Sequence, residues 1–127
     1  MKKETENWLK IAKNDLKVAE TLLKERHYVS VVEHSHAALE KLMKGIIAEQ
    51  KDVQPPKIHD LLKLVTLTLI ENLQKDMERT LDELNDLYLS ARYSGDFDAL
   101  VKILHKNKIE DIFKRSKEVF AWLQKQI

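Results

Sequence analysis

The stretch Glu33-His34-Ser35-His36-Ala37-Ala38-Leu39-Glu40-Lys41 decides the fold, because it lies inside a long segment with helical periodicity. Apolar residues recur through this segment at spacings of three, four and seven, which is the pattern of one helix face: Val32, Leu39, Leu42, Met43, Ile46 and Ile47. We therefore predict one helix from Tyr28 or Val29 to Gln50. Its small residues let a neighbouring helix approach closely: Ser35, Ala37, Ala38 and Gly45.

The same period continues on both sides of this segment. Further helices are predicted over these ranges: about Thr5 to Glu25, His59 or Asp60 to Leu69, Asn72 or Gln74 to Tyr93, Phe97 to His105, and Asn107 to the end. We expect Leu69 to face inward and the last helix to begin with a capping box of Asn107 and Glu110. The inward face of that last helix is predicted to be Ile109, Ile112, Phe113, Ser116, Val119, Phe120 and Leu123.

Composition agrees with a helical protein. The 127 residues contain only two glycines and two prolines, which favours long uninterrupted helices, and no segment alternates polar and apolar residues as a strand would. Apolar residues make up 43%, enough for a folded core at this length. We predict one domain, residues 1–127, with an all-α fold: an up-and-down antiparallel bundle of about five helices.

Charge and cysteine content exclude several functional classes. Charged residues reach 34% but nearly cancel, to a net charge of +1, so bulk attraction to nucleic acid or to an anionic membrane is not predicted. A local charged patch stays open, and with it RNA as a partner that the net charge does not indicate. The absence of cysteine removes disulfides, thiolate metal sites and cysteine nucleophiles. The first residues are charged without an apolar signal segment, and the apolar stretch 61–70 is too short to span a bilayer. We expect a soluble cytoplasmic protein.

Two polar pairs mark a candidate ligand site. His59 and Asp60 stand at a predicted helix start after two prolines, and Arg92 and Tyr93 stand at a predicted helix end before Gly95. Helix ends retain unsatisfied backbone groups and can bind ligands, phosphate above all at an N-terminus. Arg92 would supply a phosphate fork and Tyr93 a stacking surface or a hydroxyl.

Plainer roles for the same residues stay open. Asp60 would be a helix cap beside a surface His59, while Arg92 would pair with Asp15 or Glu40 and Tyr93 would pack its ring. Asp15 lies on the apolar face of the first helix, so it is either at the boundary with water or buried beside a partner such as Arg92 or a histidine.

The central helix carries a pair of residues with the spacing of metal ligands. His36 and Glu40 are four residues apart and share a helix face, but no third ligand follows, so we predict neither metal nor cofactor. A hydrogen bond between them, or a contact between subunits through His36, is the expected role.

Four segments, in this order, carry a family resemblance: Trp8-Leu9 with Ala12, Asp15-Leu16 and Ala19; Tyr28 with His34 to Lys41; His59-Asp60-Leu61; and Ala91-Arg92-Tyr93. Together they resemble the HEPN domain and cover most of the chain. The resemblance implies a helical bundle of the type found in nucleotidyltransferase substrate-binding subunits and in the helical C-terminal part of kanamycin nucleotidyltransferase. It also implies a homodimer, nucleotide binding, and a minimal nucleotidyltransferase as partner in a toxin–antitoxin-like module.

Many HEPN proteins are metal-independent ribonucleases with an Arg followed four to six residues later by a His. This chain departs from that motif: His105 is too far from Arg92, and His34 lies beyond the window after Arg26. Three functional hypotheses remain. The leading one is a binding and interaction module, with His59, Asp60, Arg92 and Tyr93 as ligand residues and Asp15, His36 and Glu40 behind them or at an interface. The others are a divergent ribonuclease toxin and a purely structural oligomerisation domain.

Overall fold

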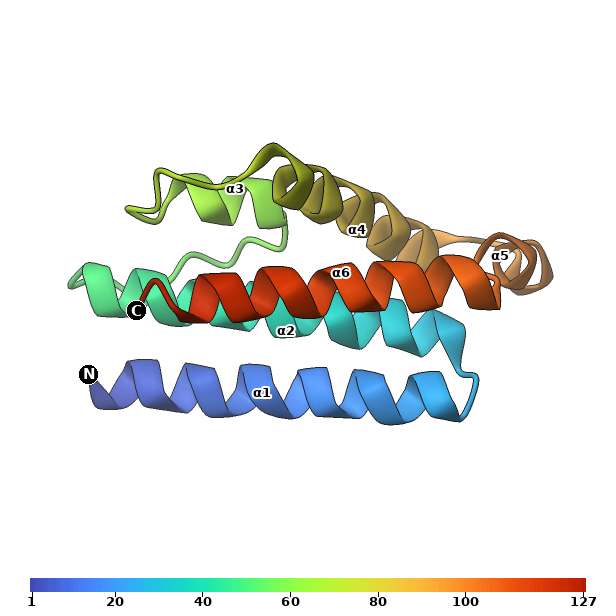
Figure 1. Cartoon of the computed structure of the whole chain (residues 1–127), viewed down its shortest axis with the longest axis horizontal. Helices are drawn as coiled ribbons and strands as arrows, with labels where there is room; N and C mark the ends of the chain where they lie inside the picture. The colour runs from blue at the N-terminus through green and yellow to red at the C-terminus, as the bar shows by residue number, and fades with distance from the viewer.

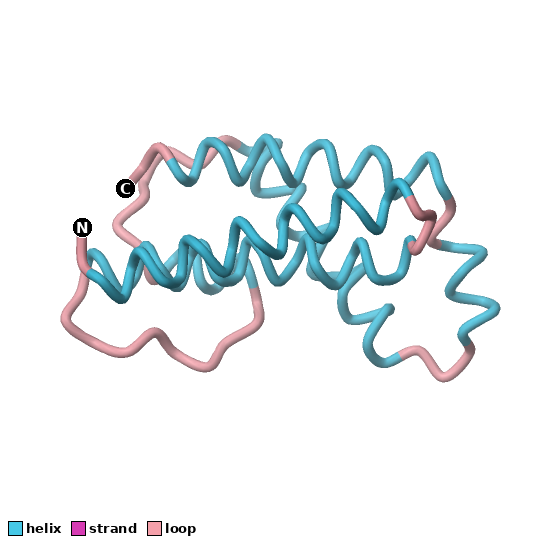
Figure 2. Tube along the Cα trace, turned by 90° about the horizontal axis from the view of Figure 1, so that it is seen from below, coloured by secondary structure: helices cyan, strands magenta, loops and turns pink.

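The computed structural model describes all 127 residues as six helices and no strand (Figures 1 and 2). Four helices are long: α1 (Lys3–Lys24), α2 (Tyr28–Gln50), α4 (Lys75–Tyr93) and α6 (Lys106–Gln124). They alternate in direction, as predicted, and both chain termini lie at the same end of the bundle (Figure 1). The short helices α3 (Leu61–Thr66) and α5 (Phe97–Ile103) precede and follow α4.

Helix α2 is the centre of the bundle and packs against α1, α3, α4, α5 and α6. Its predicted apolar face is buried throughout, because this helix is covered on several sides at once. The predicted inward face of α6 is also confirmed, since all seven of its residues are buried. The close approach expected along α2 occurs at Gly45, where an added Cβ would lie 2.9 Å from the Cβ of Trp8 in α1.

Two expectations about helix ends are wrong. Helix α6 begins at Lys106 rather than Asn107, because His105, two residues before the predicted cap Asn107, caps the helix: its Nδ1 atom accepts a hydrogen bond from the Lys108 amide at 3.4 Å. Leu69 does not face inward but is 67% exposed, because α3 ends at Thr66 and the chain turns away.

The turn between α1 and α2 contains the only residue with a positive φ, Arg26 at 64°. The amide of His27 donates to the carbonyl of Leu22 at 2.9 Å, and that of Arg26 donates to the carbonyl of Leu23 at 3.1 Å. These two bonds form a Schellman motif, whose left-handed position is usually glycine. An arginine there costs roughly 1 kcal/mol of backbone strain.

Candidate functional site

Asp60 caps helix α3, as one of the two interpretations of the sequence predicted. Its Oδ1 atom accepts hydrogen bonds from the amides of Leu62 at 3.0 Å and Lys63 at 3.3 Å. The same oxygen accepts a third bond, at 2.9 Å, from the side-chain amide of Asn85 in α4. The cap therefore ties the start of α3 to the middle of α4.

Asn85 organises this region and was missed from the sequence. Its Oδ1 atom accepts from the Leu61 amide at 3.1 Å and lies 3.1 Å from Nε2 of His36. An amide oxygen can only accept, so His36 must donate through Nε2. A signal was present: Asn85 interrupts the apolar stripe of α4 one residue after the buried Leu84.

His36 is held as a neutral ring in the core. It is 1% exposed and stacks on Tyr88 with ring centroids 3.8 Å apart and an angle of 10° between the planes. Burial lowers the pKa of His36 to about 4, against the opposing effects of the Asn85 hydrogen bond and the Glu40 charge. Its Nδ1 atom has no hydrogen-bond partner and lies 3.7 Å from Oε1 of Glu40.

Glu40 lies beneath the surface and holds two cationic or potentially cationic groups. Its Oε2 atom accepts from Nζ of Lys44 at 3.1 Å, and its Oε1 atom lies 3.0 Å from Nδ1 of His59. Because a carboxylate accepts, Nδ1 of His59 carries the proton and its Nε2 is left facing outward. The His59 side chain is 67% exposed, so a ligand can reach its ring.

These groups line a hollow of about 380 Å³ between α2, α3 and α4, called here the acidic hollow: His36, His59, Asp60, Leu62, Asp82, Asn85, Asp86, Tyr88 and Leu89. Three of the lining residues are carboxylates. No lysine or arginine forms an ion pair with Asp82 or Asp86. The hollow therefore carries a negative potential and attracts cations.

Arg92 and Tyr93 lie beyond this hollow and do not line it. The guanidinium carbon of Arg92 lies 5.9 Å from the centroid of the Tyr88 ring, and the Tyr93 side chain does not pack, since Tyr93 is 73% exposed. Arg92 and His36 thus both contact Tyr88, which links Arg92 to the hollow. Tyr93 instead lines a shallow depression with residues of α5.

The proposed pairing of Arg92 with Asp15 or Glu40 is wrong, because both carboxylates have other partners. Asp15 is buried, at 8% exposure, and its two oxygens lie 2.6 Å from Nζ of Lys41 and 3.3 Å from Nδ1 of His34. Asp15 therefore fastens α1 to α2 and does not belong to the hollow.

The structure places His36, Glu40, His59 and Asp60 together and leaves Asp15 and the 92–93 pair outside. No cluster of three or more histidine, cysteine or acidic side chains is arranged to hold a metal ion. None of the helices is both long enough and apolar enough to cross a bilayer.

Comparisons with known proteins agree with the fold. A family profile described as the HEPN domain matches residues 5–126. A crystal structure of TT1696 from Thermus thermophilus superposes with a TM-score of 0.83 and 19% identity, over 99% of this chain and 100% of that one. A second, ST0689, described as an archaeal HEPN homologue, gives 0.74 and 19%, over 98% of each chain. No curated protein matches significantly.

Proposed function

Because the chain belongs to the HEPN domain family, we propose that it is a binding and interaction module that works with a separate protein partner. The acidic hollow is the docking point, and it receives a lysine or arginine side chain of that partner. A minimal nucleotidyltransferase is the first partner to test, since the family resemblance suggests it. The observation that carries the proposal is the set of three carboxylates around the hollow, none of which forms an ion pair with a lysine or an arginine.

The shape and charge of the hollow support a basic side chain as occupant. Leu62 and Leu89 would contact its aliphatic stem, while Asp82 and Asp86 would pair with its head group. A charged group that enters a partly buried site lined by opposite charge gains more than it would in water. Leu89 is 52% exposed, so covering it adds an apolar contribution.

A phosphate is less well suited to the same place. The amides at the start of α3 are already occupied: Leu61 by Asn85, and Leu62 and Lys63 by Asp60. The helix N-terminus therefore has few free donors for an anion. A phosphate beside His59 would also face the carboxylates of the hollow. The nucleotide expected at His59, Asp60, Arg92 and Tyr93 is for these reasons a weaker candidate than a basic partner.

Calorimetry with a minimal nucleotidyltransferase from the same genome tests this proposal. The double variant Asp82→Asn, Asp86→Asn should weaken binding by roughly tenfold or more, because it removes both unpaired charges. Asp52→Asn, at an exposed carboxylate outside the hollow, is the matched control and should leave the affinity unchanged. Tight binding that both the double variant and the control retain would exclude the hollow as the docking point.

A ribonuclease is the second candidate, and the Glu40–His59 pair favours it. A carboxylate that holds one imidazole nitrogen leaves the other as a general base, which could accept the proton of a ribose 2′-hydroxyl. Against it, the surrounding carboxylates repel an RNA backbone, and Arg92 lies outside the hollow. RNA incubated with the protein decides: cleavage that His59→Gln abolishes would support the enzyme.

The homodimer that the family resemblance implies stays a proposal. It is supported by exposed apolar side chains at the end of α4 and on α5: Tyr93, Phe97, Val101 and Ile103. Burying such side chains is the main driving force of stable self-association. Light scattering should give twice the chain mass, and Phe97→Asp should give the monomer. A protein that is monomeric before the substitution would contradict this part of the proposal.

A further inference from the structure

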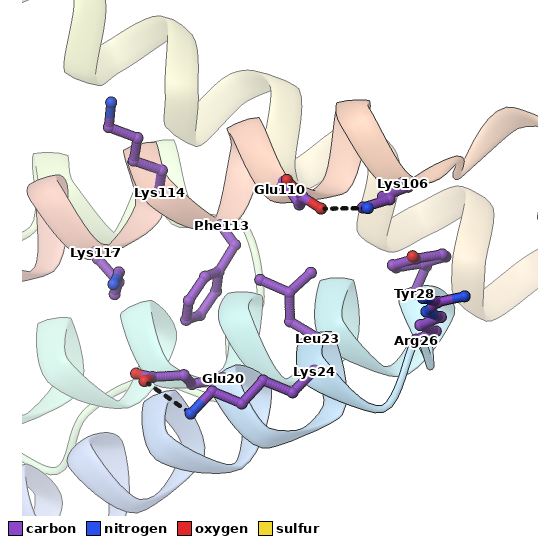
Figure 3. Close-up of a pocket in the computed structure, with 10 residues that line it drawn as sticks. All are labelled: Glu20, Leu23, Lys24, Arg26, Tyr28, Lys106, Glu110, Phe113, Lys114 and Lys117. Carbon is purple, nitrogen blue, oxygen red and sulfur yellow. Dashed lines mark ion pairs between the residues drawn. The ribbon is translucent and has the colours of Figure 1, made fainter.

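A second concave surface lies between α1 and α6, on a different part of the bundle from the acidic hollow (Figure 3). Both helices pack mainly against α2 and only slightly against one another, which leaves a groove between them. Its volume is about 520 Å³. We call it the basic groove, and its lining residues are Glu20, Leu23, Lys24, Arg26, Tyr28, Lys106, Glu110, Phe113, Lys114 and Lys117.

The groove carries a positive charge. The ammonium group of Lys114 points away in Figure 3, so its charge lies outside the groove. The other charged groups of the lining are four cations and two carboxylates, which gives a formal charge of four minus two, or +2. A concave surface with one sign of charge raises the local concentration of groups of the opposite sign. The groove therefore favours an acidic ligand.

Two of these four cations are unpaired. Arg26 and Lys117 form no ion pair with any acidic side chain. The other two cations form one pair each, at 3.8 Å and within their own helices: Lys24–Glu20 and Lys106–Glu110. Exposed pairs of this kind contribute little free energy. Arg26 and Lys117 are therefore the cations most readily available to carboxylates of a partner.

The apolar floor of the groove lies between the two unpaired cations. Figure 3 shows Leu23 and Phe113 turned toward one another. Lys117 lies on one side of them, and Arg26 lies beside Tyr28 on the other side (Figure 3). Leu23 and Tyr28 are half-buried, so each keeps some surface that an apolar side chain of a ligand can cover. The groove thus offers a cation at each end and an apolar surface in the middle.

The backbone of Arg26 gives an independent indication that its side chain has a use. Arg26 has a φ of 64° and occupies the left-handed position of the turn after α1, where glycine would fit without strain. A residue kept in a strained backbone conformation is a reason to infer a function for it. The planar guanidinium group of an arginine can donate two parallel hydrogen bonds to one carboxylate.

The spacing of the cations favours a peptide over a phosphate group. Along α6 the lining runs from Lys106 to Lys117, which is about 16 Å at about 1.5 Å per residue. About five residues of an extended peptide span this length, at about 3.3 Å each. A phosphate group is bound by several donors that converge on it, whereas the unpaired cations stand at opposite ends of this groove. A glutamate on each wall would also repel a dense run of negative charge.

We propose that the basic groove binds an acidic linear segment of another protein. A carboxylate at one end of the segment pairs with Arg26, a carboxylate at the other end pairs with Lys117, and an apolar side chain between them rests on Leu23. The complementarity between these carboxylates and the two unpaired cations is the observation that favours this occupant. The proposal is independent of the acidic hollow, which shares no residue with the groove and attracts groups of the opposite charge.

Fluorescence anisotropy with labelled six-residue peptides at low salt tests the proposal. We expect the peptide Asp-Glu-Leu-Trp-Glu-Asp to bind. The uncharged peptide Asn-Gln-Leu-Trp-Gln-Asn should bind at least tenfold more weakly, because the carboxylates carry the attraction. The peptide Asp-Glu-Ser-Ser-Glu-Asp should bind about fivefold more weakly than the first, because the apolar contact is lost. The affinity of the first peptide should fall as salt is added.

Variants of the protein separate the groove from general electrostatics. Arg26→Gln and Lys117→Gln should each weaken binding of the first peptide about fivefold to tenfold, because each removes one partner of a carboxylate. Lys114→Gln is the matched control: it makes the same charge change on the same helix, but its ammonium group points away, so the affinity should change less than about twofold. Arg26→Gly should lose the same affinity as Arg26→Gln while its thermal midpoint rises by about 2–4 °C, so that the loss cannot come from unfolding.

Three results would overturn the proposal. One is that the first peptide does not bind at low salt. Another is an equal loss of affinity in Lys114→Gln and Lys117→Gln, which would mean that only net charge matters. The last is that ATP or a short single-stranded RNA binds more tightly than the peptide and loses affinity in Arg26→Gln and Lys117→Gln, which would give the groove to a phosphate ligand.

Discussion

Acid should destabilise this protein through one buried histidine. Burial lowers the pKa of His36 from 6.5 to about 4 in the folded chain, and unfolding restores the ordinary value. Between these two pKa values the unfolded chain binds a proton that the folded chain does not, so stability rises with pH across this window. The contribution is complete above pH 6.5 and is lost as the pH falls toward 4.

The size of the effect follows from the two pKa values. A shift of one unit corresponds to about 1.4 kcal/mol, so the limit at low pH is about 3 kcal/mol. Between about pH 7.5 and about pH 5, the loss from His36 alone is about 2 kcal/mol. The charges that face His36 are Glu40 on its own helix and His59 and Asp60 at the start of α3, while Asn85 and Tyr88 contact it from α4. The two carboxylates oppose the shift, and burial outweighs them.

Urea unfolding followed by circular dichroism at the two pH values measures this loss. His36→Gln keeps a donor toward Asn85 but cannot be protonated. Between the two pH values, this variant should therefore lose about 2 kcal/mol less unfolding free energy than the wild type loses. His27→Gln makes the same replacement at an exposed position and should keep the wild-type dependence. If His36→Gln and the wild type lose the same free energy, His36 is not the titrating group and the reasoning fails.

The remaining predictions concern packing, backbone strain and one ion pair, each measured by urea unfolding. Gly45→Ala should destabilise the protein by about 1 kcal/mol, although alanine has the better helix propensity, because the side chain of Trp8 must move. Gly95→Ala is the control and should not destabilise the protein, since the added Cβ meets no atom within 4 Å. Arg26→Gly should stabilise by about 0.5–1 kcal/mol by relieving the positive φ, and unchanged stability would argue against strain. Asp15→Asn should cost about 2 kcal/mol, because the amide has no charge and only one acceptor oxygen, so one of the two groups on α2 loses its acceptor; a cost below about 0.5 kcal/mol, on the scale of an exposed pair, would contradict it.

The fold could be predicted from the sequence because the apolar residues that repeat with a helical period are the ones that the folded chain buries. The faces of α2 and α6 follow a helical period over several turns, and a helix can bury such a face only by packing against others. Helix ends were less predictable. His105 caps α6 with an imidazole nitrogen, a use that residue preferences at helix starts do not suggest.

The candidate site was predictable only where neighbouring residues share a helix end. His59 and Asp60 lie together because the start of α3 holds both. The partners of Asp15 could not be identified, because lysine and histidine on α2 compete with Arg92 on α4, and only the packing distance decides between them. Asn85 was missed because a single amide has no motif, although its break in an apolar stripe was visible.

A net charge of +1 therefore hides two sites of opposite sign. The prediction that bulk attraction to nucleic acid or membrane is absent used the sum of all charges, and a sum says nothing about where the charges lie. Folding gathers Asp60, Asp82 and Asp86 around the acidic hollow, whereas a second concave surface between α1, the start of α2 and α6 is lined by five cationic residues and only two acidic ones: Lys24, Arg26, Lys106, Lys114 and Lys117, with Glu20 and Glu110.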